Sequence, residues 1–192
     1  MSNKLGLNLS RNYSINFDLP KRDKKKIIFI ILHYTGMKKE SEAIKRLCDP
    51  KSKVSSHYFL KKNGEVLNLV PDLYIAWHAG KSGWKKFKSL NHYSIGIEIS
   101  NPGHDHGYEK FSSNQISSLI KLLKFLIRKY NINKQNILGH SDIAPNRKKD
   151  PGEKFPWRKL GIKKMCEWRT LDEKIIKKYR CLKVKSNEEK IF

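Results

Sequence analysis

Hydrophobic residues form a regular pattern only from residue 27 onward. The stretch 1–26 is polar, ends in the basic cluster KRDKKK and shows neither strand nor helical periodicity, so we expect a basic N-terminal arm lying over the domain. Ile27 to Leu32 is a continuous apolar run, typical of a strand buried on both faces, and the polar residues from His33 to Gly36 follow at once. This run predicts a central strand with polar side chains at its end.

Two later segments have helical spacing. Residues 40–48 place Ala43, Ile44 and Leu47 on one side and stop before Pro50. Residues 112–115, SSNQ, resemble a capping box, and apolar residues then recur at helical spacing at 116, 119, 120, 123, 126, 127 and 130. We therefore expect a short helix and a long amphipathic one.

The remaining regular segments have the spacing of strands. Residues 57–60 and 66–70 flank an Asn-Gly turn signal, which predicts a hairpin. Residues 94–100 alternate in period 2, so that Glu98 faces away from Ile95, Ile97 and Ile99. Residues 136–139 form a short strand that runs into His140, and 141–157, rich in Pro, Gly and charge, predict a loop.

Strands interleaved with helices predict an α/β fold: a single domain with a central mixed β-sheet flanked by helices. The expected divisions are the arm at 1–26, the domain at 27–160 and a basic C-terminal region at 161–192, with a helix near 171–179 and a charged tail at 183–190. In such a fold the polar residues at strand ends share one edge or groove of the sheet.

Charge and cysteine content restrict the partners and the compartment only in part. The net charge of +23 suits an anionic partner, but a lysine-rich composition throughout the chain explains it equally well. The three cysteines have no Cys-x-x-Cys spacing and are expected to be free thiols. No signal peptide and no transmembrane segment are visible, which favours the cytoplasm by default and leaves a periplasmic or secreted location by another route open. We expect a monomer.

Of the seven histidines, His33 and His140 directly follow predicted strands. A lone histidine at a strand end is more often a hydrogen-bonded structural residue than a ligand. Catalytic zinc, however, commonly takes two histidines and a carboxylate and keeps its fourth position open, and Asp150 in an Asp-Pro-Gly turn could supply the carboxylate. These three residues are the candidate ligands of one Zn²⁺ ion.

Amide hydrolysis at such a site needs two further groups. One moves a proton from water to the leaving nitrogen, and the other stabilises the oxyanion. Glu98 and Lys148 are the candidates, although an exposed strand carboxylate and one more surface lysine are the plainer interpretations of the same residues.

Five segments in order carry a resemblance to a known family. They are IIFIILHYTG at 27–36, VSSHYFLKKNGEV at 54–66, LVPDLYIAWHAGKSGW at 69–84, HYSIGIEISN at 92–101 and ILGHSDIAPNRKKDPGEKFPW at 137–157. Together they resemble the zinc amidases of the AmpD/AmiD type, the N-acetylmuramoyl-L-alanine amidase 2 family, whose fold is shared by peptidoglycan recognition proteins and T7-type lysozyme.

The resemblance implies a role for each candidate. It assigns His33, His140 and Asp150 to the zinc, Glu98 to acid/base catalysis and Lys148 to the oxyanion. The implied reaction is hydrolysis of the amide between N-acetylmuramic acid and L-alanine in peptidoglycan or muropeptides, including 1,6-anhydro forms, for wall turnover or recycling.

Other motif residues have weaker assignments. Trp77 and His78 resemble groove residues of the family, but a loop packed on the sheet explains them equally well. Asn91 and Arg147 flank motif positions and are candidates for binding sugar or peptide carboxylate. Three other histidines are interpreted as non-ligands, with His57 structural and His104 and His106 in a loop at the groove rim.

Two alternatives remain beside the enzyme. One is a peptidoglycan-binding module that has lost catalysis, which the complete set of five site residues disfavours. The other is additional nucleic-acid binding by the basic termini, for which the chain contains no recognised motif, so no specific nucleic acid is expected. The segments at 69–84 and after Asp150 resemble the AmiD branch more than the AmpD branch. No lipoprotein signal like that of the AmiD branch is visible, and we expect the region after Trp157 to be too short and too basic for that branch's peptidoglycan-binding extension.

Overall fold

The computed structural model describes residue 6 and residues 8–167 of the chain. The predicted helix at 171–179 and the tail at 183–190 lie outside the described residues. A six-stranded mixed sheet in the order β1-β5-β4-β9-β3-β10 forms the centre. Its strands are β1 (Leu9–Arg11), β3 (Phe29–Tyr34), β4 (Tyr58–Leu60), β5 (Val66–Asn68), β9 (Ser94–Ile99) and β10 (Ile137–Gly139).

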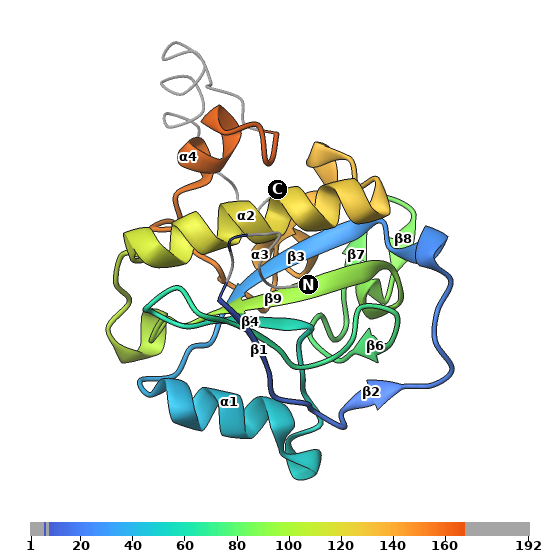
Figure 1. Cartoon of the computed structure of the whole chain (residues 1–192), viewed down its shortest axis with the longest axis horizontal. Coiled ribbons are helices and arrows are strands. Elements are labelled where there is room, and N and C mark those ends of the chain that lie inside the picture. Colours follow the sequence, from blue (N-terminus) through green and yellow to red (C-terminus); the bar gives the residue numbers. More distant parts are fainter. Residues whose placement is uncertain (1–5, 7, 168–192) are drawn as a thin grey trace.

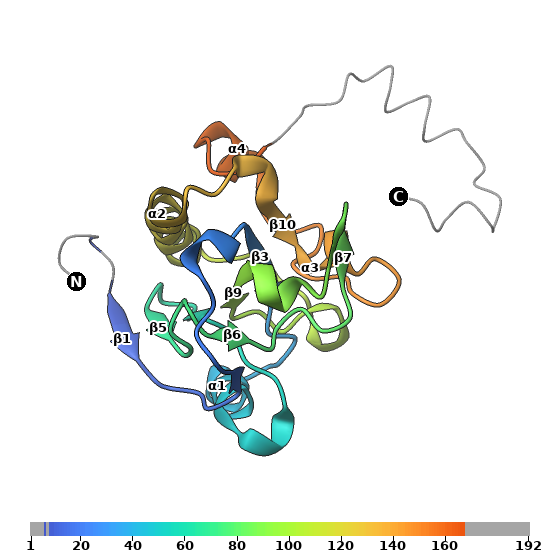
Figure 2. The ribbon, with the colours of Figure 1, turned by 90° about the vertical axis from the view of Figure 1, so that its right-hand side faces the viewer.

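Helices cover both faces of this sheet, as predicted. Two short ladders and several single helical turns complete the described elements. The ladders pair β2 (Phe17–Asp18) with β6 (Ile75–Ala76) and β7 (Gly83–Trp84) with β8 (Phe87–Lys88). The α-helices are α1 (Glu40–Cys48), α2 (Ser113–Tyr130), α3 (His140–Ile143) and α4 (Trp157–Ile162). The 3₁₀ turns are η2 (Lys24–Lys26), η3 (Pro50–Ser52), η4 (Leu90–Tyr93), η5 (His104–His106) and η6 (Lys134–Asn136). Figure 1 shows α2 lying along one face of the sheet and α1 against the other, and Figure 2 shows the same layers end-on.

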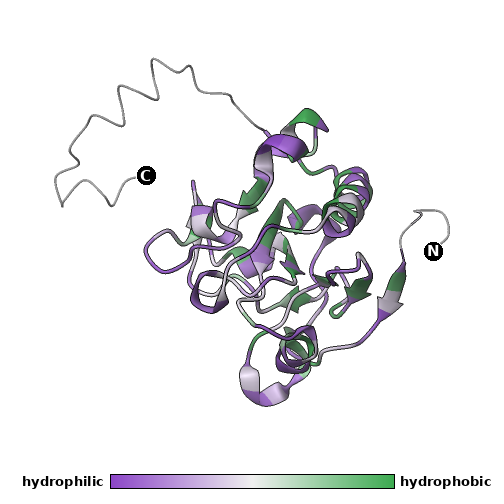
Figure 3. Cartoon of the chain, turned by 90° about the vertical axis from the view of Figure 1, so that its left-hand side faces the viewer, coloured by the Kyte–Doolittle hydropathy of each residue, from purple (hydrophilic) through white to green (hydrophobic). Residues whose placement is uncertain are grey.

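The long helix α2 begins and ends as its sequence predicts. The Ser112 hydroxyl accepts from the Gln115 amide at 3.1 Å and the Gln115 side chain accepts from the Ser112 amide at 2.9 Å, which completes the capping box. Asn131 ends the helix in the left-handed conformation, at φ 53°. The apolar side of α2 packs on Ile30 and Leu32 of β3 and on the isoleucines of β9, and each buried Leu or Ile contributes about 1.5–3 kcal/mol. Figure 3 shows hydrophobic residues, in green, on the strands at the centre of the chain. This core fixes the sheet on which the polar residues stand.

The opposite face of the sheet has two separate apolar clusters. Phe29 and Ile31 pack with residues around Ala79 and Ile143, whereas Phe59 packs beneath α1. The period-2 alternation of strands places His33 and Glu98 on this same face, between the two clusters. The face therefore has an apolar margin on either side and a polar centre.

The hairpin predicted around the Asn-Gly signal joins β4 and β5 as an antiparallel pair. Gly64 in its turn has φ 89°, and a Cβ there would lie 3.0 Å from the Asn114 carbonyl oxygen and from the Ser118 hydroxyl of α2. Glycine is required at this position because the turn is left-handed and packs directly on the helix.

Three expectations about secondary structure are corrected by the structure. The arm at 1–26 contains β1, which pairs in parallel with β5, and β2, which pairs with β6; strands of two or three residues are too short to show periodicity. The predicted loop at 141–157 contains most of the single turn α3, and the central strand ends at Tyr34 rather than Leu32. At the predicted boundary of 160, α4 continues to Ile162, and Met165 and Cys166 belong to the core.

Within the described residues, no helix combines the length and the apolarity needed to cross a bilayer.

A buried carboxylate ties the hairpin to the end of α2. Asp72 accepts hydrogen bonds from the Tyr58 hydroxyl at 2.7 Å, the Tyr130 hydroxyl at 2.6 Å and the Lys129 ammonium at 2.7 Å. Burial alone would raise the pKa of Asp72, but the bonds from Lys129, Tyr130 and Tyr58 outweigh it and lower the pKa below its ordinary value.

Asp72→Asn is expected to lower the free energy of unfolding by about 1.5–3 kcal/mol at pH 7, the usual worth of hydrogen bonds to a charged group. Because the pKa of Asp72 is depressed in the folded chain, its contribution is present above the ordinary pKa and is lost as the pH falls. Urea unfolding should show the deficit shrinking below about pH 4. The exposed Asp105→Asn serves as the control, and a pH-independent deficit would contradict the assignment.

Candidate functional site

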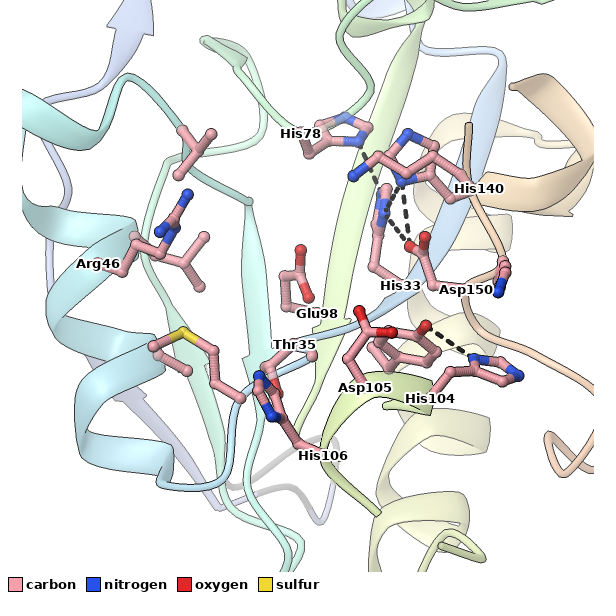
Figure 4. A pocket seen from close by; sticks show the side chains of 18 of the residues that line it. His33, Thr35, Arg46, His78, Glu98, His104, Asp105, His106, His140 and Asp150 are labelled. Atoms are coloured by element: carbon pink, nitrogen blue, oxygen red, sulfur yellow. Dashed lines mark hydrogen bonds and ion pairs between the residues drawn. The ribbon is translucent and has the colours of Figure 1, made fainter. Parts of the chain in front are cut away.

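A groove of about 630 Å³ opens on the polar centre of the sheet face that α2 does not cover. Its walls come from the end of β3, the side of α1, the loop at η5 and the segment that follows α3. Figure 4 shows the side chains of β3, β9 and the 140–150 segment pointing into one space, with α1 on the other side. The strand-end polar residues therefore share one groove, as predicted.

The predicted metal ligands meet at one end of this groove. His33 lies near the end of β3, and His140 is the first residue after β10, the strand that pairs in parallel with β3. The Nδ1 atoms of His33 and His140 are 2.9 Å apart, and the Asp150 Oδ2 atom lies 3.0 Å from the first and 3.1 Å from the second. All three side chains are buried.

The chemistry of this set suits a cation. Burial lowers the pKa of His33 to about 4, so its ring is neutral near pH 7. Burial alone would raise the pKa of Asp150, but the facing His140 and His33 rings lower it below its ordinary value, which leaves an anionic carboxylate. A carboxylate and two ring nitrogens thus face one another inside the chain, an arrangement that a positive ion stabilises.

The spacing also suits a metal. Ligand atoms about 2.0–2.1 Å from a tetrahedral zinc ion lie about 3.3 Å from one another, close to the observed separations. Within residues 6 and 8–167, His33, His140 and Asp150 form the one group of histidine, cysteine or acidic side chains whose ligand atoms all lie within 4.8 Å of each other. These residues could hold a metal ion with a position left open towards the groove.

Glu98 stands beside the metal ligands because of strand register. It is paired with His33 across the parallel ladder of β3 and β9, so the two side chains share a face. Its Oε2 atom is buried and has no hydrogen-bond partner among the described residues. Burial raises the pKa of Glu98 well above its ordinary value, the Asp150 charge raises it further, and Lys148 opposes both.

The short segment after α3 supplies three of the Lys and Arg side chains that line the groove, Arg147, Lys148 and Lys149. Lys148 lines it, and its charge is close enough to lower the pKa of both His33 and Glu98. Arg147 also lines the groove, but its guanidinium donates to the Ala79 carbonyl at 2.6 Å and to the Lys81 carbonyl at 2.6 Å. Arg147 therefore also holds the neighbouring loop in place.

The other predicted groove residues differ in their placement. Trp77 lines the groove and donates from its indole nitrogen to Asp18 at 2.8 Å. His78 reaches the groove but is largely buried, with Nδ1 3.0 Å from the His33 Nε2 atom. Asn91 is not among the lining residues, and its side chain accepts from the backbone amides of His78 and Ala79.

The three histidines interpreted as non-ligands lie apart from the metal group. His57 is fully buried and accepts from the Gly96 amide at 3.0 Å. His104 and His106 line the groove rim, where the His104 Nε2 atom lies 2.9 Å from a carboxylate oxygen of Glu153 and its Nδ1 atom 2.9 Å from the Tyr34 hydroxyl.

Sequence reasoning missed two features of the groove. Arg46 of α1 lines it, although only its helical position, three residues after Ala43, hints at this side of the helix. The bond between His78 and His33 was also missed, because residues 45 positions apart give no local signal of contact.

Comparison with known proteins agrees with this geometry. Residues 23–153 match the family model Amidase_2, described as N-acetylmuramoyl-L-alanine amidase. The N-acetylmuramoyl-L-alanine amidase AmiD of Escherichia coli is 38% identical over 155 residues, which cover 74% of this chain and 55% of that protein. The 1,6-anhydro-N-acetylmuramyl-L-alanine amidase AmpD of Enterobacter cloacae is 39% identical over 111 residues, covering 56% of this chain and 55% of that one.

A solved structure has the same fold. The complex of E. coli AmiD with anhydro-N-acetylmuramic acid-L-Ala-D-γ-Glu-L-Lys superposes with a TM-score of 0.72 at 32% identity, covering 87% of this chain and 68% of that one. The predicted resemblance and fold class are confirmed. The chain spans little more than half the length of the curated relatives that it matches.

The site should bind one divalent metal ion per chain, measurable by elemental analysis and by competition with a chromophoric chelator. Asp150→Ala removes the anionic ligand and should weaken binding by more than about 100-fold, since changes outside the ligand set alone cost about 10–100-fold. His104→Ala, at the rim, should leave the affinity unchanged. Equal affinity for Asp150→Ala and the unaltered chain would show that the ion is held elsewhere.

Proposed function

The chain belongs to the Amidase_2 family of N-acetylmuramoyl-L-alanine amidases, and from this premise we propose that it hydrolyses the amide between N-acetylmuramic acid and L-alanine. The substrate is peptidoglycan or a muropeptide, including 1,6-anhydro forms, and the role is wall turnover or recycling. The observation that carries the proposal is the meeting of His33, His140 and Asp150 within 2.9–3.1 Å beside Glu98, whose Oε2 atom has no hydrogen-bond partner among the described residues.

Zinc is the proposed metal, because two imidazoles and one carboxylate form a common set of ligands for catalytic zinc. When bound, zinc acidifies water and polarises a carbonyl oxygen. His33, His140 and Asp150 would hold it at the inner end of the groove, where burial excludes competing solvent.

Glu98 is proposed as the acid/base residue. Its carboxylate accepts a proton from the attacking water and delivers it to the leaving nitrogen. A pKa raised by burial and by Asp150 brings the group closer to neutral pH, where a residue that must both take and give a proton works best. Its free Oε2 atom faces no competing donor among the described residues.

Lys148 is proposed to stabilise the negative charge that develops on the carbonyl oxygen. It lines the groove close to Glu98 and the metal ligands. A preplaced cation in a site that excludes water stabilises such a charge without reorganisation.

The proposed substrate fits the charge of the groove. Arg46, Arg147, Lys148 and Lys149 all line it, so a peptide stem bearing carboxylates is favoured over a neutral chain. AmpD relatives are named for 1,6-anhydro substrates, and AmiD has been seen with an anhydro-muropeptide. Trp77 remains a proposed contact for sugar or peptide at this groove.

Two other functions are weaker candidates. A binding module without catalysis would not need Glu98 and Lys148 beside a complete metal group. Nucleic-acid binding by the basic termini rests on charge alone, and 168–192 lie outside the described residues. Retention on heparin and on wall sacculi across a salt series separates these partners, because phosphate contacts weaken steeply with salt.

The proposal is tested by mass spectrometry of products from intact sacculi and from 1,6-anhydro muropeptides. Stem peptides with a free L-alanine amino group should be released from at least one of them, and a chelator should abolish the release. Activity that persists after complete metal removal would overturn the mechanism.

Glu98→Gln should lower kcat by about 10²–10⁴-fold, the usual range for a general acid/base, and keep the bound metal. Because Glu98 must be ionised to accept a proton, kcat/KM should rise with pH through its raised pKa, above the ordinary value of about 4.3. This acid limb should vanish in Glu98→Gln. A variant with full activity would remove Glu98 from the mechanism.

Lys148→Ala should lower kcat by about 10²–10³-fold, as the loss of an oxyanion-stabilising group does. Lys149→Ala makes the same change of charge at the next residue and should mainly affect KM. Steady-state kinetics on one muropeptide compares the two, and equal losses of kcat would point to a general charge effect instead.

A further inference from the structure

The segment His78–Ala79 lies behind both histidines of the metal group. The His78 ring contacts His33, and the Ala79 carbonyl contacts His140. We propose that this segment fixes the tautomers of both metal histidines, so that His78 is a positioning residue for the metal site rather than a contact for substrate. The inference rests on the proposed metal site and names what orients it.

The direction of every hydrogen bond behind His33 follows from one carbonyl group. The Leu90 carbonyl can only accept, so the Ser94 hydroxyl donates its single proton to it, at 2.6 Å. The Ser94 oxygen must then accept from the His78 Nε2–H group, at 3.1 Å. A neutral imidazole carries one proton, so the His78 Nδ1 atom is an acceptor.

The acceptor at His78 Nδ1 also determines which nitrogen of His33 carries the proton. The His78 Nδ1 atom lies 3.0 Å from the His33 Nε2 atom, which must therefore carry the proton. The His33 Nδ1 atom then presents its lone pair to the space shared with His140 and Asp150 (Figure 4). Only this tautomer of His33 can ligate a metal through Nδ1.

His140 is oriented by the next residue of the segment. Its Nε2 atom has two neighbours, the Ala79 carbonyl oxygen at 3.2 Å and the Arg147 Nη2 atom at 3.4 Å. The Arg147 Nη2 group donates to the same carbonyl at the much shorter distance of 2.6 Å, so the carbonyl is the nearer partner of Nε2. Because a carbonyl can only accept, Nε2 carries the proton and Nδ1 faces the metal group. Two consecutive residues thus set the tautomers of two ligands that are far apart in the sequence.

The structure holds this segment firmly. The Asn91 side-chain oxygen accepts from the His78 amide at 3.2 Å and from the Ala79 amide at 2.7 Å. Gly96 of β9 leaves room for the ring, because a Cβ there would lie 2.3 Å from the Cγ atom of His78. His57 packs edge-on against the other side of the ring, with centroids 5.6 Å apart.

These contacts leave little of His78 for a substrate. Both ring nitrogens are engaged, one by His33 and one by Ser94, and the residue is only 8% exposed. The Asn91 side-chain oxygen likewise already accepts hydrogen bonds from the backbone amides of this segment. Both residues, expected from the sequence to bind substrate, are therefore assigned to the support of the metal ligands.

The test compares two substitutions of His78. In His78→Phe the ring volume remains but the acceptor is lost, and Zn²⁺ affinity should fall by about 10–100-fold, as for other groups that orient ligands. In His78→Asn the side-chain oxygen stands where Nδ1 stood and should restore most of the affinity. Trp77→Phe, a neighbouring aromatic change outside the hydrogen-bond chain, should bind Zn²⁺ as the unaltered chain does.

A second measurement reads the tautomer itself. Long-range ¹H–¹⁵N spectra of the metal-free chain report which His33 nitrogen carries the proton. The His78 Nδ1 atom favours a proton on Nε2, whereas the Asp150 carboxylate, 3.0 Å from the His33 Nδ1 atom, favours one on Nδ1. In His78→Phe the acceptor at Nε2 is lost, so the His33 population should move toward the Nδ1-protonated form while His140 stays unchanged. A purely structural role for His78 would lower thermal stability without moving the His33 tautomer.

Unchanged Zn²⁺ affinity and an unchanged His33 tautomer in His78→Phe would overturn the proposal. If that variant does not fold, Ser94→Ala gives the same decision, because removing one oxygen at the end of the chain should also move the His33 population toward the Nδ1-protonated form and weaken Zn²⁺ binding. Amidase activity is a separate readout. Its absence in the unaltered chain would refute the proposed function and leave the tautomer result standing.

Discussion

The parallel register of β3 with its two neighbours is the constraint on which the site depends. It sets His33 opposite Glu98 on one side and brings the end of β10, with His140, to the other. A shift of one residue in either pairing would turn these side chains to the α2 face, among the isoleucines. The apolar alternation that builds the core beneath α2 is therefore the same pattern that directs the reactive groups into the groove.

The buried polar groups at the centre of the sheet lower the stability of the folded chain. It buries neutral imidazoles, the anionic Asp150 and a carboxylate at Glu98 that has an oxygen without a partner in the described part of the chain. Such groups destabilise a fold unless they are paired or bind a cation. The continuous core under α2, the two apolar clusters beside the groove and the hydrogen bonds at Asp72 supply the stability that permits this site. Local rules of packing are broken mainly where chemistry is expected.

Much of the fold was predictable because its main elements are long or strongly patterned. The capping box of α2, the Asn-Gly hairpin and the alternation of β9 are local signals, and each has its expected place. The short strands β1 and β2 were not predictable, since their pairing partners β5 and β6 are more than fifty residues away and they bury little. A local sequence pattern does not predict which distant strand a short segment pairs with.

The candidate site likewise contains residues that could be predicted from the sequence and contacts that could not. Two histidines at the ends of strands and a carboxylate in a rigid turn could be singled out from sequence, and the family resemblance joined them with Glu98 and Lys148. The contacts of His78 with His33 and of Asn91 with the 78–79 backbone could not, because they depend on how loops pack behind the sheet. Arg46 could not be predicted as a groove residue, because nothing in the sequence distinguishes it from other arginines on amphipathic helices.

The central proposal is that the strand register assembles one zinc site from two imidazoles and one carboxylate. X-ray absorption at the zinc edge, recorded on the loaded full chain, tests this most directly. The account predicts only nitrogen and oxygen neighbours at about 2.0–2.2 Å, with the multiple-scattering signature of two imidazoles. A sulfur neighbour at about 2.3 Å, or a signature of no imidazole, would contradict it.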